Sequence, residues 1–101
     1  MLSINFTDAQ GKVKKTYTVV SLKMGLVEKL MDIQEQQARI SEGAQTAADQ
    51  KALWANMGAL LVEVFGRQFT YDELKDGVDI KEMVRCFNDM AAFITESVSK
   101  N

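Results

Sequence analysis

The stretch FGRQFTYDELKDGVDIKEM, residues 65–83, decides the fold because it concentrates charged residues and two glycines between two apolar runs. Such a stretch suits either a binding site or a set of signals that end one helix and begin the next. Thr70 and Glu73 have the spacing of a capping box, in which each side chain accepts a hydrogen bond from the backbone N–H of the other residue. Asp79 and Glu82 repeat that spacing. The carboxylates of this stretch are therefore predicted to cap helices.

Helices are expected on both sides of these caps. A short helix should cover residues 71–76, and Gly77 is placed to end it in a left-handed turn. Residues 80–98 then carry apolar side chains at spacings of three and four, which is typical of an amphipathic helix. Before the quoted stretch, residues 47–65 keep the helical period, and Gly66 supplies a C-terminal stop.

Farther toward the N-terminus, the sequence predicts another helix and a hairpin. Ser21 can cap a helix that runs to about residue 40, and Thr46 can open the helix that follows. Residues 2–7 and 13–20 alternate apolar and polar side chains, which is the period of a β-strand. The sequence DAQGK between these strands has the composition of a short hairpin loop.

The expected fold class is mainly α. A β-hairpin over residues 1–20 should precede a helical part over residues 21–99, with three main helices and one short connecting helix. The chain lacks proline, low-complexity tracts and repeats, so residues 1–101 are expected to form a single domain.

The composition argues against catalysis. The chain has no histidine and a single cysteine, Cys86, so the usual zinc sites and imidazole-based catalysis are excluded. Asp72 and Asp76 suggest a calcium-binding loop, but Leu74 and Met83 stand at its third and twelfth positions, where oxygen ligands are needed. We therefore expect no enzyme activity, no metal ion and no cofactor.

The charge distribution and the hydropathy limit the partners. The net charge is -2, yet residues 1–23 hold four lysines against Asp8 alone, so the helices are acidic. An acidic helical part disfavours binding to nucleic acid. No apolar run approaches the roughly 18 residues that cross a bilayer, and the N-terminus lacks the pattern of a signal peptide. A cytosolic protein that does not bind membranes is expected.

The helices carry wide apolar faces for so small a protein. Around residues 22–40, a second apolar stripe with Met24, Val27 and Met31 lies beside the predicted core stripe. Trp54 widens the apolar face of the next helix in the same way. We hypothesise that these four residues bind a partner, either another protein or another copy of the chain. The alternative, in which the hairpin and the helices bury all four, remains open.

The run ALLVEVFGRQFTYDELKDGVDIKEMVRCFNDMAAFI resembles the C-terminal half of small tail assembly chaperones of long-tailed (siphovirus-type) bacteriophages. In that family an apolar helix ends in a phrase like VFGRQFT, followed by DEL, by DG and by a final amphipathic helix. The resemblance covers about residues 52–95. It implies a non-enzymatic protein that binds the tape-measure protein and guides the tail-tube protein to polymerise around it. It also implies a homo-oligomer that acts in the cytoplasm of the bacterial host and is absent from the mature virion.

Two other classes of protein compete with this interpretation. A structural virion adaptor, such as a head-tail joining protein, would bury similar apolar surface permanently. A small DNA-binding helical regulator would need basic and polar side chains on an exposed recognition helix. Lys81 and Arg85 share their helix face with Glu82 and Asp89, which makes the regulator the weaker alternative.

Overall fold

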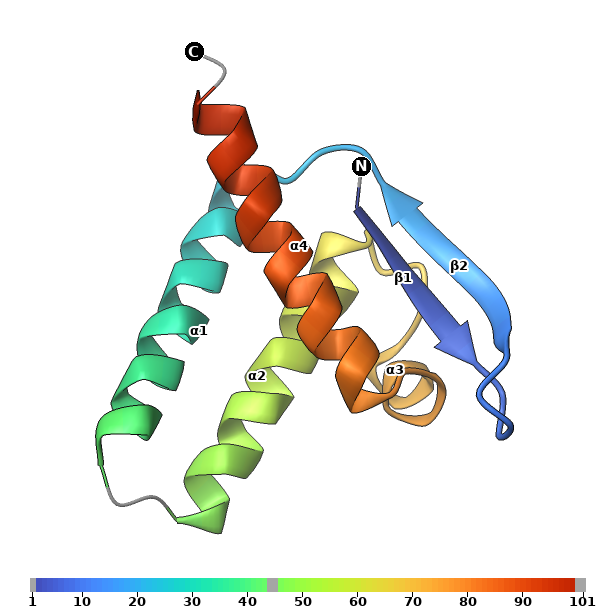
Figure 1. The fold of residues 1–101 in the computed structure, drawn as a ribbon, viewed down its shortest axis with the longest axis horizontal. Coiled ribbons are helices and arrows are strands. Elements are labelled where there is room, and N and C mark those ends of the chain that lie inside the picture. The colour runs from blue at the N-terminus through green and yellow to red at the C-terminus, as the bar shows by residue number, and fades with distance from the viewer. Residues whose placement is uncertain (1, 44–45, 100–101) are drawn as a thin grey trace.

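The computed structural model describes the backbone of residues 2–43 and 46–99, and their side chains except those of residues 41, 42 and 97–99. An N-terminal two-stranded hairpin is followed by four helices (Figure 1). The elements are β1 (Leu2–Thr7), β2 (Val13–Val19), α1 (Met24–Glu42), α2 (Ala47–Val64), α3 (Tyr71–Gly77) and α4 (Ile80–Ser99). This order confirms the predicted mainly α fold with a hairpin and one short connecting helix.

Capping chemistry sets the starts of α2 and α3, as predicted. The Thr46 hydroxyl accepts a 3.1 Å hydrogen bond from the Asp49 N–H, and the Asp49 carboxylate accepts one from the Thr46 N–H. Thr70 and Glu73 form the same reciprocal pair at 3.1 and 3.0 Å. Each pair satisfies two N–H groups that the first turn of a helix otherwise leaves without partners.

The end of α2 also follows the prediction. Gly66 has a φ of 68°, in the left-handed region. Its N–H donates to the Glu63 carbonyl at 3.0 Å, and the Arg67 N–H donates to the Val62 carbonyl at 2.9 Å. These two bonds form a Schellman motif, which closes the last turn of the helix.

The start predicted for α1 is wrong. The helix begins at Met24 after Lys23, and no side chain caps it, so Ser21 is not the N-cap. The N–H groups of Leu26 and Val27 donate to the Lys23 carbonyl at 3.0 and 3.1 Å. The chain stays extended through residue 22 because that leucine leads from the hairpin to the helix and packs half-buried against the core.

The role predicted for Gly77 is also wrong. This residue lies inside α3 and has no positive φ, and Val78 follows it as the C-cap. The Phe6 ring packs against the Gly77 backbone so closely that a Cβ atom there would stand 2.6 Å from the Phe6 Cδ2 atom. Close packing between the strand and the helix, rather than a left-handed turn, therefore requires glycine at position 77.

The hairpin lies on the helices through one strand. Leu2, Ile4 and Phe6 of β1 are buried in the core, whereas β2 is exposed except for partial burial of Tyr17 and Val19. The strands pair antiparallel, with an irregularity between Phe6 and Thr7.

The other edge of β1 faces α4. The Asn5 N–H donates to the Glu82 carboxylate at 2.7 Å, and the Arg85 guanidinium donates to the Ser3 carbonyl at 3.0 Å. The second predicted capping box is therefore only half formed. The Asp79 carboxylate accepts from the Glu82 N–H at 2.8 Å as expected, but the Glu82 carboxylate is directed to Asn5 and Arg85.

The described part of the molecule is flat, with Cα extents of 40 × 38 × 19 Å. The helices α1 and α2 form a helical hairpin, and α4 crosses in front of α2 with the strands on its other side (Figure 1). The buried core joins β1 to all four helices, with Leu30 and Ile33 contributed by α1. Phe6, Phe65 and Phe69 of the core and the partly buried Tyr17 form an aromatic cluster. So thin a body leaves several helices with a face that no other element covers.

Candidate partner-binding surfaces

The four residues predicted to bind a partner do not lie in the interior. The exposed fractions are 79% for Met24, 60% for Met31 and 37% for Trp54, while Val27 is half-buried. A methionine exposed to that degree contributes little to the core. The structure therefore contradicts the alternative in which the hairpin and the helices conceal all four side chains.

These residues lie on two surfaces rather than one. Met24, Val27 and Met31 follow one side of α1 and form what we call the methionine stripe. Trp54 instead lines a groove between α2, α3 and the start of α4, and no residue of the methionine stripe lines that groove. We call this second surface the Trp54 groove; its apolar lining is formed chiefly by Trp54, Gly58, Tyr71, Leu74, Ile80 and Met83.

The Trp54 groove has a volume of about 300 Å³. Its floor is buried at Gly58 and Leu74. Its rim is formed by large apolar side chains that stay exposed, with exposed fractions of 37% for Trp54, 36% for Tyr71 and 65% for Ile80. Because most exposed apolar residues of a monomer are scattered, this grouping around one groove indicates an interaction site.

Gly58 explains how the groove is built. A Cβ atom at this position would stand 2.4 Å from the Tyr71 Cε1 atom, so the tyrosine ring lies directly against the α2 backbone. The Lys75 ammonium lies 4.8 Å from the centre of that ring and 3.3 Å from the Asp72 carboxylate. The groove thus combines an apolar floor with two charged residues in its lining, Lys75 and Asp79.

Two apolar residues near the start of α4 are exposed. Ile80 and Val84 belong to the apolar stripe predicted for the last helix, yet 65% and 41% of their surfaces are exposed. The buried face of α4 is centred on Cys86, Phe87 and Met90. The stripe is wider than this face, so its N-terminal members extend beyond the core. Val98, the last member, has a side chain outside the described residues.

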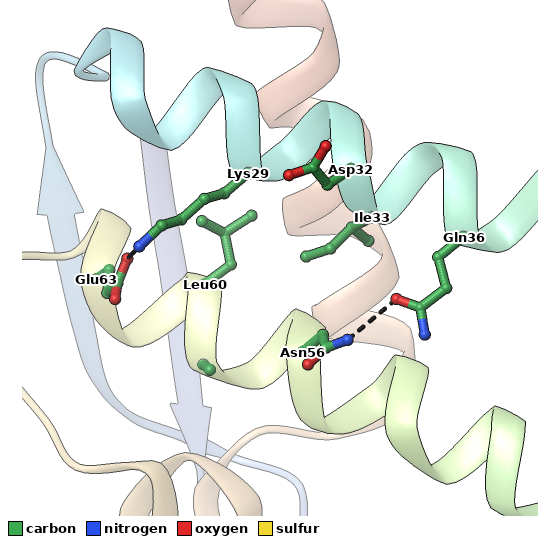
Figure 2. Close-up of a pocket in the computed structure, with 8 residues that line it drawn as sticks. Lys29, Asp32, Ile33, Gln36, Asn56, Leu60 and Glu63 are labelled. Carbon is green, nitrogen blue, oxygen red and sulfur yellow. Dashed lines mark hydrogen bonds and ion pairs between the residues drawn. The ribbon is translucent and has the colours of Figure 1, made fainter.

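A second cavity of about 290 Å³ lies between α1 and α2 and is more polar (Figure 2). The Lys29 ammonium pairs with the Glu63 carboxylate at 2.7 Å, which lowers the pKa of that carboxyl group. Two turns away on each helix, the Asn56 amide donates to the Gln36 amide oxygen at 3.0 Å (Figure 2). These bonds link the two helices across the cavity, and we assign them a structural role.

The described residues form no metal-binding cluster, and their one cysteine is buried. Within residues 2–43 and 46–99, no group of three or more histidine, cysteine or acidic residues is arranged to hold a metal ion. The Cys86 thiol is buried, and this burial raises its pKa to about 12. No described helix combines the length and apolar character that crossing a membrane requires.

Comparison with known protein families assigns the chain. A family model described as "Phage tail chaperone protein" matches residues 1–101. The chain belongs to the phage tail chaperone family. The match extends the resemblance seen in residues 52–95 to the hairpin and α1 of this tail chaperone. Searches of curated proteins and of solved structures gave no match.

Proposed function

We propose that this tail chaperone is non-enzymatic and binds the tape-measure protein while the tail-tube protein assembles around it. The observation that carries the proposal is the Trp54 groove, an open apolar site rimmed by Trp54, Tyr71 and Ile80 in a chain of the tail chaperone family. Action in the cytoplasm of the bacterial host and absence from the mature virion belong to the same proposal.

The groove suits an amphipathic helix of a long client. Apolar side chains at spacings of three and four residues project from one face of such a helix and can enter a single groove. Each square ångström of apolar surface removed from water contributes roughly 25 cal/mol. Trp54 and Tyr71 are large amphipathic side chains of the kind that dominate binding energies at interfaces. By covering an apolar stripe of the client, the groove would keep it from aggregating before the tube encloses it.

The methionine stripe supplies a second part of the proposal. Flexible thioether side chains adapt to differently shaped partners, so Met24 and Met31, with Val27 beside them, suit contacts between copies of this chain. Replacing Met24 and Met31 by glutamate is expected to abolish a homo-oligomer, measured by sedimentation, while the far-ultraviolet circular dichroism stays unchanged. Loss of helical signal would instead place both methionines in the core.

Co-expression with the tape-measure protein of the same phage genome tests the client. We expect a complex in pull-down and a larger soluble fraction of the client. Trp54→Ala and Ile80→Glu should each weaken capture at least tenfold, because they remove an anchor or place a charge on the groove rim. Ala92→Glu is the matched control, since it adds the same charge at an exposed position of α4 away from the groove.

Two results would count against the proposal. If wild type, Trp54→Ala and Ile80→Glu captured the client equally well, the groove would not be the binding site. If no complex formed, the tape-measure protein would not be the client.

Mass spectrometry of purified virions distinguishes a chaperone from a structural adaptor. A head-tail joining protein would remain in the particle, whereas a chaperone should be absent.

A further inference from the structure

The two strands of the hairpin differ in how their outer edges are used. The outer edge of β1 is occupied by α4, because the Asn5 N–H donates to Glu82 and the Ser3 carbonyl accepts from Arg85. Among the described residues the sheet consists of these two strands, so β2 forms its other edge. An edge strand presents unpaired N–H and C=O groups to which a further strand can bond.

The register identifies the open groups. Asn5 pairs with Thr16, and Ser3 pairs with Thr18. In an antiparallel ladder, the backbone N–H and C=O groups of two opposite residues either bond to each other or both point away from the partner strand. Asn5 and Ser3 direct these groups away from β2, toward α4. The backbone groups of Thr16 and Thr18 therefore point away from β1, at the outer edge of β2. The Gln68 amide donates to the Thr18 carbonyl at 3.4 Å. The outward N–H and C=O of Thr16 have no bond to any described residue, so the edge is open there.

The charge around this edge is positive. Lys12, Lys14 and Lys15 are exposed and form no ion pair with any described residue. The Lys15 ammonium instead lies 4.7 Å from the centre of the Tyr17 ring. The hairpin carboxylate, Asp8, accepts hydrogen bonds from two backbone N–H groups of its own turn and is directed away from the strand edge.

We propose that the outer edge of β2 binds an extended, acidic segment of a partner protein by strand addition, centred on Thr16. The backbone of the segment would bond to the N–H and C=O of Thr16 and to the N–H of Thr18, and its carboxylates would pair with Lys14 and Lys15. A hollow beneath β2 is lined by these lysines but also by Glu73 and Asp76. Those carboxylates repel an acidic segment, so the segment lies along the edge and not in the hollow.

A second copy of the same strand is a poor occupant. Pairing β2 with itself would bring two sets of Lys14 and Lys15 onto one short ladder, and like charges on adjacent strands destabilise pairing. Lysines on an edge strand commonly prevent such self-pairing. An acidic strand removes that repulsion. This inference concerns a surface apart from the Trp54 groove and does not depend on the client proposed above.

The test uses the full chain and a ten-residue peptide of alternating valine and glutamate, with alternating valine and lysine as the control peptide. We expect the acidic peptide to bind at low salt, to protect the Thr16 and Thr18 amides from hydrogen exchange, and to bind at least tenfold more weakly at high salt. The lysine peptide should not bind. Equal binding of both peptides, or binding without protection at Thr16, would overturn the proposal.

Two variants separate the backbone contribution from the charge. Thr16→Pro removes the outward N–H and leaves the backbone hydrogen bonds to β1 in place, and it should weaken binding at least tenfold. Thr16→Val is its control, because it removes only the 2.7 Å bond from the Thr16 hydroxyl to the Asn5 side chain and should leave binding unchanged. The double variant Lys14→Glu, Lys15→Glu should also weaken binding of the acidic peptide at least tenfold. This variant tests the proposal even if the proline variant fails to fold. Lys51→Glu with Lys81→Glu changes two exposed lysines outside the hairpin and should leave binding unchanged.

Sedimentation of the free chain tests the other occupant. A dimer that protects the Thr16 amide and disappears in Thr16→Pro would show that a second copy fills the edge, and the acidic segment would be the wrong partner. A chain whose Thr16 amide exchanges freely until the acidic peptide is added supports the proposal.

Discussion

The Arg85 guanidinium donates a 3.0 Å hydrogen bond to the Ser3 carbonyl across 82 positions of sequence, and the same side chain pairs with Glu82 and Asp89. This bond joins the last helix to the first strand. Together with the bond from the Asn5 N–H to Glu82, it satisfies backbone groups that the edge of β1 would otherwise expose. These two bonds therefore add to the burial of Leu2, Ile4 and Phe6 in holding the hairpin on the helices.

Replacing Arg85 by alanine should lower the free energy of unfolding by about 1 to 2 kcal/mol, since a partly exposed charged hydrogen bond is lost. Calorimetry measures the effect. Arg39→Ala is the control, because Arg39 pairs with Glu35 on the surface and 77% of its side chain is exposed. That variant should change stability by less than about 0.5 kcal/mol. Similar losses in both variants would contradict the role assigned to Arg85.

The Glu82 carboxyl group should make stability depend on pH. The hydrogen bond from Arg85, and then that from the Asn5 N–H, lower the pKa of Glu82 below its ordinary value of 4.5. The pKa of Glu82 is lower in the folded than in the unfolded protein. Its contribution to the free energy of unfolding is therefore complete above the unfolded pKa and is lost as the pH falls through the folded pKa. Denaturant unfolding of wild type and Glu82→Gln should differ by a constant amount above about pH 6 and converge toward acid pH. A difference that stays constant down to acid pH would argue against the pairing.

Gly77→Ala should destabilise the protein by about 1 to 3 kcal/mol, because the added Cβ atom meets a Phe6 ring held in the aromatic cluster. Gly25→Ala is the matched control. Nothing lies within 4 Å of a Cβ atom at Gly25, so alanine there should be neutral or stabilise α1 by up to about 1 kcal/mol. Thermal unfolding compares the two, and equal effects would mean that the contact at position 77 is not tight.

Gly58→Ala should change the Trp54 groove more than the overall stability. The added Cβ atom meets the Tyr71 ring, but 36% of Tyr71 is exposed, so this ring can swing into solvent. We expect a smaller loss of stability than for Gly77→Ala and a changed Trp54 fluorescence. Unchanged fluorescence together with full stability would show that the tyrosine does not pack on α2.

The Cys86 thiol should be unreactive in the folded protein. Its burial raises its pKa to about 12, so almost no thiolate forms near neutral pH. Iodoacetamide at about pH 8 should label it only after unfolding, and the labelling rate should therefore follow the denaturant-induced unfolding transition. Rapid labelling of the native chain would mean that α4 opens locally at Cys86.

Part of the candidate site could be found in the sequence. The width of the apolar faces left the exposure of Met24, Met31 and Trp54 as one of two open alternatives, and the structure leaves all three exposed. The sequence could not show that Trp54 belongs to a different surface from the methionines, because the groove that Trp54 lines is completed by residues of α3 and α4. Tyr71 was not predicted at all. The sequence signal for it was Gly58, whose missing side chain makes room for a ring, but the sequence does not name that ring.

The sequence by itself determined where α2 and α3 begin and where α2 ends, because capping boxes and a Schellman motif join residues only three to five positions apart. Only the tertiary structure decided that Gly77 accommodates Phe6 and that Glu82 turns from its own helix to β1. It also decided which apolar faces remain open. The Asn5–Glu82 bond, for example, joins residues 77 positions apart, and a local pattern carries no record of such contacts.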